Sequence, residues 1–224
     1  MHQRLRNENS RIVIVDYGMG NIQSIYNAFE VVGEKACIVN DPSELSDAKA
    51  IILPGVGAFS DGIKNLQKLG FIDPLEEEVL RKGKPYLGIC LGMQFLARES
   101  HEHGLHKGFG WIPGAVKKIE PSDPGFKVPH MGWNNVKVLK KDDVLFAGLG
   151  ENPVFYFVHS YHLEPEEAFG GRVTSTSWHG TTITASVRKD NIFGVQFHPE
   201  KSQGAGLKLL ENFVALVNRG DLHS

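Results

Sequence analysis

The stretch Ile12-Val13-Ile14-Val15-Asp16-Tyr17-Gly18-Met19-Gly20-Asn21-Ile22 gives the first indication of the fold. Its first four residues are apolar and β-branched, which is typical of a strand covered on both faces. A glycine-containing turn follows. Beyond it, apolar residues recur at helical spacing as far as Val32, and Gly33 fits a helix C-cap. The stretch therefore predicts a strand, a turn and a helix.

The same order of elements recurs through the first half of the chain. Apolar runs predict buried strands at 36–39, 50–53 and 85–89, and helices are predicted at 60–82 and 91–98. Strands that alternate with helices indicate βαβ units and a parallel sheet.

From about residue 112 strands dominate, and one helix, with Leu207, Leu210 and Phe213 on its apolar face, closes the chain. These later strands are predicted at 114–119, 135–139, 153–158, 172–177, 182–188 and 191–197. The pattern predicts one α/β domain over residues 11–220, with a central mixed, mostly parallel sheet and helices on both faces.

Composition limits the classes of function. The chain has 224 residues, of which 41% are hydrophobic, and this suffices for one large core. A net charge of −2 without a polybasic block argues against nucleic acid or a membrane surface as partner. Residues 1–10 lack the apolar core of a signal peptide, and we predict a polar disordered tail there. The two cysteines, Cys37 and Cys90, are typical of a reduced cytoplasmic protein, and Cys37 is predicted to lie in the core.

The candidate nucleophile lies in Gly88-Ile89-Cys90-Leu91-Gly92, between a predicted strand and a predicted helix. This is the G-x-nucleophile-x-G elbow with cysteine in the serine position. The turn is so sharp that the residues two before and two after the nucleophile must be small. The N-terminus of the following helix favours a thiolate, and the N–H of Leu91 is placed to stabilise an oxyanion. The alternative is a buried structural cysteine between packing glycines.

A candidate base and its orienting carboxylate lie in Phe197-His198-Pro199-Glu200. Side chains two apart on an extended backbone share a face, so His198 and Glu200 lie together. The carboxylate fixes one imidazole nitrogen, and the other can take the cysteine proton. By itself the tripeptide could also be a surface turn.

Two further segments need a choice between readings. Leu53-Pro54-Gly55-Val56-Gly57 follows a strand, and its glycines allow backbone N–H groups to face a ligand. The rival, a dinucleotide-binding loop, needs a third glycine where Ser60 stands. The run 101–106 contains three histidines and Glu102, but without a matching ligand set elsewhere we predict a solvated loop and no metal site.

Taken together, the motifs identify a family. Pro54-Gly55-Val56-Gly57, Gly88–Gln94 and His198-Pro199-Glu200 resemble the class I, triad-type glutamine amidotransferases. Three more stretches are similar to the branch that serves imidazole glycerol phosphate synthase in histidine biosynthesis: Asp16–Asn21, Val128–Asn134 and Val158–His162. The resemblance runs from about residue 11 to 219 and implies a flavodoxin-like fold.

The resemblance implies roles for individual residues. Cys90 would attack the glutamine side-chain amide, His198 would carry the proton and Glu200 would orient it. The resemblance implies no cofactor. Gly57 and Leu91 would form the oxyanion hole. The residues that would hold the substrate are Gly55, Gln94, Glu102, Ser160 and Tyr161. The ammonia would pass to a (β/α)8-barrel cyclase partner, and the residues that would face this partner are Asn21, Trp133 and Tyr156. Trp133 and Tyr156 could instead be core aromatics.

Alternatives remain at the level of function. The stretches 21–25 and 108–112 are similar to a sibling group whose partner amidates a surface-polysaccharide sugar, which leaves the acceptor open. A stand-alone cysteine hydrolase or peptidase of similar fold would share the elbow but would not need His159-Ser160-Tyr161. A catalytically inactive binding module is disfavoured because the three candidate catalytic side chains are all present.

Overall fold

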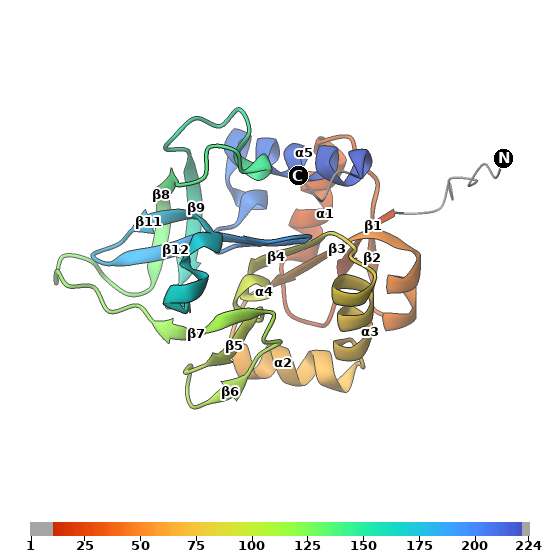
Figure 1. Ribbon diagram of the computed structural model, residues 1–224, viewed down its shortest axis with the longest axis horizontal. Coiled ribbons are helices and arrows are strands. Elements are labelled where there is room, and N and C mark those ends of the chain that lie inside the picture. Colours follow the sequence, from red (N-terminus) through yellow and green to blue (C-terminus); the bar gives the residue numbers. More distant parts are fainter. Residues whose placement is uncertain (1–10, 221–224) are drawn as a thin grey trace.

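The computed structural model describes residues 11–220, so the tail predicted at 1–10 lies outside the described residues. Its core is a nine-stranded sheet (Figure 1). The strands lie in the order β2 (Ala36–Val39), β1 (Arg11–Val15), β3 (Ala48–Gly55), β4 (Tyr86–Cys90), β13 (Ile192–Val195), β12 (Thr182–Lys189), β11 (Val173–Trp178), β8 (His130–Val138) and β9 (Val154–His159).

The sheet is parallel from β2 to β13 and antiparallel from β13 to β9. This division confirms the mixed sheet predicted from the change of pattern near residue 112. Strands β3, β4 and β13 are neighbours and run in the same direction, so their carboxyl ends meet at one edge. Open α/β sheets place their sites at that edge.

Helices cover both faces of the parallel half, as predicted (Figure 1). On one face α1 (Ile22–Val31) and α5 (Gln203–Arg219) pack over Ile12 and Ile14 of β1. On the other face α2 (Phe59–Lys68) and α3 (Ile72–Glu76) pack over Val13 and Val15. Successive side chains of a strand point to opposite faces, so the apolar run of β1 supplies two cores.

A second, four-stranded sheet was not predicted. It contains β10 (Tyr161–Pro165), β7 (Ile112–Lys118), β5 (Ala97–Ser100) and β6 (His106–Lys107). The prediction of a helix over 91–98 is therefore wrong beyond its first turn, because α4 spans only Leu91–Gln94. Later residues of the chain take the carbonyls that a longer helix would use: Phe109 N donates to Phe95 O at 2.8 Å, and Ile112 N donates to Leu96 O at 2.9 Å.

Five short helical turns complete the described chain. They are η1 (Pro42–Asp47), η2 (Glu77–Arg81, a π-helical turn that continues α3), η3 (Val144–Phe146), η4 (Glu167–Arg172) and η5 (Pro199–Lys201).

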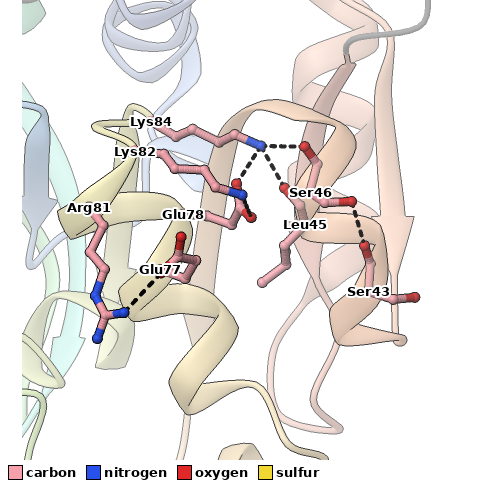
Figure 2. Close-up of polar contacts among 8 residues, drawn as sticks. All are labelled: Ser43, Leu45, Ser46, Glu77, Glu78, Arg81, Lys82 and Lys84. Atoms are coloured by element: carbon pink, nitrogen blue, oxygen red, sulfur yellow. Dashed lines mark hydrogen bonds and ion pairs between the residues drawn. The ribbon is translucent and has the colours of Figure 1, made fainter.

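An ion cluster fixes the amino end of β4 (Figure 2). The buried carboxylate of Glu78 lies 2.7 Å from the ammonium groups of both Lys82 and Lys84. Lys84 also donates to the carbonyls of Leu45 and Ser46, at 2.9 and 2.6 Å. These contacts tie η1 and η2 to the segment that enters β4. Cys90 stands at the other end of the same strand, so the cluster is a structural anchor away from the candidate site.

Candidate active site

Cys90 occupies a strained backbone position at the carboxyl end of β4. Its φ and ψ are 54° and −105°, in a region that side-chain-bearing residues rarely adopt. A Cβ atom at Gly88 would collide with the backbone of Gly92, and one at Gly92 would overlap the carbonyl oxygen of Leu53. The prediction that the residues two before and two after the nucleophile must be small is confirmed.

The contacts of the sulfur differ from the prediction. Because α4 is a single turn, its dipole favours a thiolate less than the predicted longer helix would. A side-chain donor is present instead: Gln196 Nε2 lies 3.6 Å from Cys90 Sγ, and Gln196 is fully buried. The sequence reasoning missed Gln196. The sequence does contain a signal for it, because Gln196 is a polar residue between the apolar Val195 and Phe197. It also lies two positions before His198, so on an extended backbone the two side chains share a face.

His198 and Glu200 form the predicted pair. His198 Nδ1 lies 2.8 Å from Glu200 Oε1, and both side chains are almost completely buried. Among residues 11–220, His198 Nε2 is buried and has no hydrogen-bond partner. This nitrogen is therefore the one that can exchange a proton with the sulfur of Cys90. The segment is held by its backbone, since His198 N donates to Tyr156 O at 2.9 Å and Ser202 Oγ donates to His198 O at 2.6 Å.

The charge state of His198 follows from its neighbours. Burial by itself would lower the pKa of His198, because it penalises the imidazolium. The negative charge of Cys90, together with the Glu200 carboxylate, outweighs burial and raises the pKa of His198 to about 10. The ring is therefore an imidazolium at neutral pH, facing the cysteine.

A cavity of about 280 Å³ opens beside Cys90. Gly57, Leu91, Gln94, Glu102, Ser160 and Tyr161 of the predicted site line it, together with Val56, Pro129, Val158 and His159. Gly55 does not line it: this residue pairs with Cys90 across β3 and β4 and packs against the Tyr17 hydroxyl and the Leu91 side chain. The structure therefore shows a packing role for Gly55, and its predicted contact with the substrate stays a prediction.

Two polar side chains of the cavity have defined orientations. Gln94 Nε2 lies 2.9 Å from Tyr161 O and 3.1 Å from Gln196 Oε1, so Gln94 can offer its Oε1 to a ligand amine. Glu102 Oε2 accepts from Phe59 N at 2.7 Å, in the first turn of α2, where the N-cap residue Ala58 makes no side-chain cap. Glu102 thus stabilises a helix start while it faces the cavity.

The two predicted oxyanion donors, Gly57 and Leu91, both line the cavity. Leu91 begins α4 directly after the nucleophile. Gly57 has φ 95°, a left-handed conformation that glycine adopts at little cost.

The predicted partner-facing residues lie on or near the surface. Trp133 and Tyr156 are opposite each other on β8 and β9, and their ring centroids are 5.8 Å apart. Trp133 is 50% exposed, so the core alternative is wrong for this residue, while Tyr156 is half-buried. Asn21 is exposed at the N-cap of α1. Exposed Met131 and Trp178, on β8 and β11, were not predicted.

Three remaining predictions concern other parts of the chain. Cys37 is only partly buried, although it packs against the core as predicted. In the run 101–106, His101 pairs with Glu99 at 3.1 Å and Glu102 turns to α2. Within the described part of the chain no three histidine, cysteine or acidic residues gather as metal ligands. No helix of residues 11–220 is long and apolar enough to cross a bilayer.

A cysteine on a strained elbow, with a histidine–glutamate pair beside it at the edge of a mixed α/β sheet, defines a triad-type cysteine amidohydrolase site. The chain belongs to the class I glutamine amidotransferases, because the model of that family matches residues 13–217. This membership confirms the resemblance inferred from the motifs.

Curated relatives indicate which branch of the family the chain resembles. The chain is 46% identical, over 92% of its length and the whole relative, to imidazole glycerol phosphate synthase subunit HisH 1 of Campylobacter jejuni. It is 44% identical to subunit HisH of Chlorobium luteolum, covering 90% of the chain and 98% of the relative.

Solved structures support the fold. A glutamine amidotransferase structure superposes with a TM-score of 0.71 at 20% identity, covering 92% of this chain and 98% of that one. A chain of the PurLQS complex of Thermotoga maritima superposes with a TM-score of 0.70 at 22% identity, with the same two coverages.

Proposed function

We propose that this chain is the glutaminase subunit of imidazole glycerol phosphate synthase and hydrolyses glutamine to glutamate and ammonia. The observation that carries the proposal is a cavity lined by Cys90 and Gln94, with the buried His198–Glu200 pair beside Cys90. The chain is also 44–46% identical over at least 90% of its length to HisH subunits.

The geometry supports a two-stage mechanism. Cys90 sulfur attacks the side-chain amide carbon of glutamine, and the oxyanion is stabilised by the N–H groups of Leu91 and Gly57. His198 gives its proton to the departing ammonia, which leaves a glutamyl thioester. A water then attacks the thioester, His198 takes its proton, and glutamate is released as the thiolate re-forms. Glu200 holds the imidazole throughout.

The ammonia passes to a (β/α)8-barrel cyclase subunit in the cytoplasm, which makes imidazole glycerol phosphate and AICAR. The exposed aromatic surface of Trp133 and Tyr156 supports this docking position. It adjoins the triad, because the carbonyl of Tyr156 accepts from the backbone of His198. The sibling function, ammonia supply to a sugar-amidating synthase, uses the same triad and differs only in the partner.

The test of the chemistry uses the two cysteines as a matched pair. Cys90→Ser abolishes glutamate release because a hydroxyl is a far weaker nucleophile than a thiolate at neutral pH. Cys37→Ser retains release, and a glutamine-mimicking electrophile labels the Cys37→Ser chain but not the Cys90→Ser chain. Near-normal glutaminase activity in Cys90→Ser, or peptide cleavage without glutamine hydrolysis, contradicts the proposal.

A second experiment tests the coupling. We propose that the resting loop turns a carbonyl at Val56–Gly57 toward the site and that the partner with its ligand favours the flipped peptide. One missing oxyanion donor costs about 10²–10³-fold in rate. The rate of glutamate release is measured with the chain alone, with the cyclase, and with the cyclase plus its ligand. The rate with the cyclase and its ligand exceeds the rate of the chain alone by at least this factor. In a Gly57→Pro chain whose loop still folds, the missing N–H removes the rise.

Equal rates in the three conditions contradict the switch but leave the triad intact. Activation by a sugar-modifying synthase in place of the cyclase selects the sibling function.

A further inference from the structure

Two buried histidines connect the surface strand β8 to the cavity. His130 on β8 and His159 on β9 are register partners, and they are 2% and 7% exposed. His130 Nδ1 lies 3.1 Å from His159 Nε2, and His159 Nδ1 lies 2.9 Å from the carbonyl oxygen of Tyr161. At the outer end, Asn134 Nδ2 lies 3.0 Å from His130 Nε2. The four residues form one continuous hydrogen-bonded chain.

Chemistry fixes the direction of every hydrogen in this chain. The Tyr161 carbonyl can only accept, so His159 Nδ1 carries a hydrogen, and in a neutral imidazole Nε2 then accepts. His130 Nδ1 must therefore donate to it, and His130 Nε2 accepts from the Asn134 amide. Burial, with His179 nearby, lowers the pKa of His130 to about 4, and burial, with His130 nearby, lowers that of His159 well below its usual value. Both rings are thus neutral, as the pattern requires.

The inner end of the chain reaches groups that surround the nucleophile. The Tyr161 carbonyl accepts from Gln94 Nε2 as well as from His159. Gln94 Nε2 also lies 3.1 Å from Gln196 Oε1, and Gln196 Nε2 points at Cys90 Sγ. The position of the Tyr161 carbonyl therefore helps to determine which way the Gln94 amide presents its oxygen to the cavity.

We propose that His130 and His159 are positioning residues for glutamine binding, which hold the Tyr161 carbonyl and through it the Gln94 amide, and so connect the surface at Asn134 with the substrate cavity. The proposal rests on the proposed glutaminase function and adds residues to it. The hydrogen bonds of the two rings go to each other, to Asn134 and to the Tyr161 carbonyl, and none goes to Cys90 or His198. We therefore expect their loss to affect substrate affinity more than the chemical step.

The test compares two substitutions at one position, in the complex with the cyclase partner. His159→Leu removes the donor to the Tyr161 carbonyl, and KM for glutamine rises at least about fivefold, as expected when a buried group loses its hydrogen bond. His159→Asn places an amide N–H where Nδ1 stood and restores KM to within about twofold of the unsubstituted value. The value of kcat changes less than KM in both variants. Calorimetric glutamine binding in a Cys90→Ser background gives the same order of affinities without catalysis.

A second matched pair of substitutions tests the outer end of the hydrogen-bonded chain, at Asn134. Asn134→Ala raises KM for glutamine, whereas Asn135→Ala, at the exposed neighbouring position, does not. An unchanged KM in a folded His159→Leu complex, or equal losses in His159→Leu and His159→Asn, overturns the inference. Absence of glutamine hydrolysis by the unsubstituted complex would instead overturn the proposed function, so the two failures are distinguishable.

Discussion

At the scale of single residues, two buried tyrosines differ in whether the hydroxyl has a hydrogen-bond partner. Tyr17 and Tyr86 are both fully buried tyrosines beneath the elbow. Tyr86 donates its hydroxyl hydrogen to Gly92 O at 2.9 Å, whereas the Tyr17 hydroxyl has no hydrogen-bond partner in the described part of the chain. Burial, and to a smaller degree the charge of Cys90, raise the pKa of Tyr17, so its hydroxyl stays protonated.

This contrast predicts opposite effects of the same substitution. Tyr86→Phe lowers the free energy of unfolding by about 1 kcal/mol because a buried hydrogen bond is lost. Tyr17→Phe leaves it unchanged or raises it, since a hydroxyl without a partner costs free energy in the folded state. Urea unfolding of both variants measures the difference. Equal destabilisation would show that the Tyr17 hydroxyl has a partner in the folded chain.

The histidine–glutamate pair predicts a pH effect. His198 gains its proton affinity partly from Glu200, and its pKa of about 10 lies above the unfolded value. The stabilisation from the charged pair is therefore complete below about pH 6.5 and is lost as pH rises through about 10. The rate kcat/KM falls on the same alkaline side, and Glu200→Gln moves that fall to lower pH because the ring loses a negative neighbour.

The control for this prediction is Glu99→Gln, since Glu99 pairs with His101 at the same spacing of two but on the surface. Glu99→Gln leaves the fall of kcat/KM at alkaline pH where it is in the unsubstituted chain.

Substitutions in the pair itself predict a difference in rate. His198→Ala loses about 10²–10⁴-fold in rate, and Glu200→Gln loses less because the orientation of the imidazole is partly kept. A greater loss in Glu200→Gln than in His198→Ala would reverse the assigned roles.

At the scale of elements, the site depends on how short segments are joined. Strand β13 leads through Gln196 and His198 into η5, which carries Glu200, and then into α5. The start of α5 packs so closely on η5 that a Cβ at Gly206 would overlap the carbonyl oxygen of Pro199. Two residues earlier, a Cβ at Gly204 would meet nothing.

These glycines predict a matched pair of outcomes. Gly206→Ala separates η5 from α5, which costs about 1–3 kcal/mol of stability and lowers kcat by moving Glu200 away from His198. Gly204→Ala is neutral or stabilises the chain by about 0.4–1 kcal/mol. Chemical unfolding and glutamate release measure both effects. Full activity in Gly206→Ala would show that the close packing does not position the carboxylate.

At the scale of the whole molecule, stability and chemistry lie at opposite ends of the same strand. The Glu78 cluster (Figure 2) anchors the entry to β4. Cys90 is the last residue of the same strand. Burial by itself would raise the pKa of Glu78, but Lys82 and Lys84 outweigh burial and lower it. Such a carboxylate stabilises the fold above its unfolded pKa, and this contribution is lost as pH falls through the folded value.

The adjacent glutamates test this anchor. Glu78→Ala lowers the free energy of unfolding by about 1–3 kcal/mol at pH 7, because Lys84 loses its buried partner. The deficit shrinks as pH falls below about 4.3, the ordinary pKa of glutamate. Glu77→Ala, which removes only an exposed pair with Arg81, costs less than about 0.5 kcal/mol. Equal losses in the two variants would show that the buried cluster is not an anchor.

The sequence by itself determined what depends on local pattern. The apolar run of β1, the helical spacing of α1, the glycines around Cys90 and the spacing of two between His198 and Glu200 each act within a few residues. The period at which apolar residues recur, and the residue types that turns require, both reflect backbone geometry. This geometry is the same wherever the segment lies in the fold. The mixed sheet, the elbow and the triad could therefore be predicted from the residues and their family resemblance.

Only the tertiary structure decided what depends on partners distant in the chain. The early end of α4 results from residues 109–112 taking the carbonyls of 95–97. Glu102 caps a helix that begins 43 residues earlier, and His130 meets His159 across 29 residues. Gln196 reaches the sulfur of Cys90 across 106 residues. A hydrogen bond needs its two atoms at about 3 Å, and for residues so far apart only the packed sheet brings them to that distance.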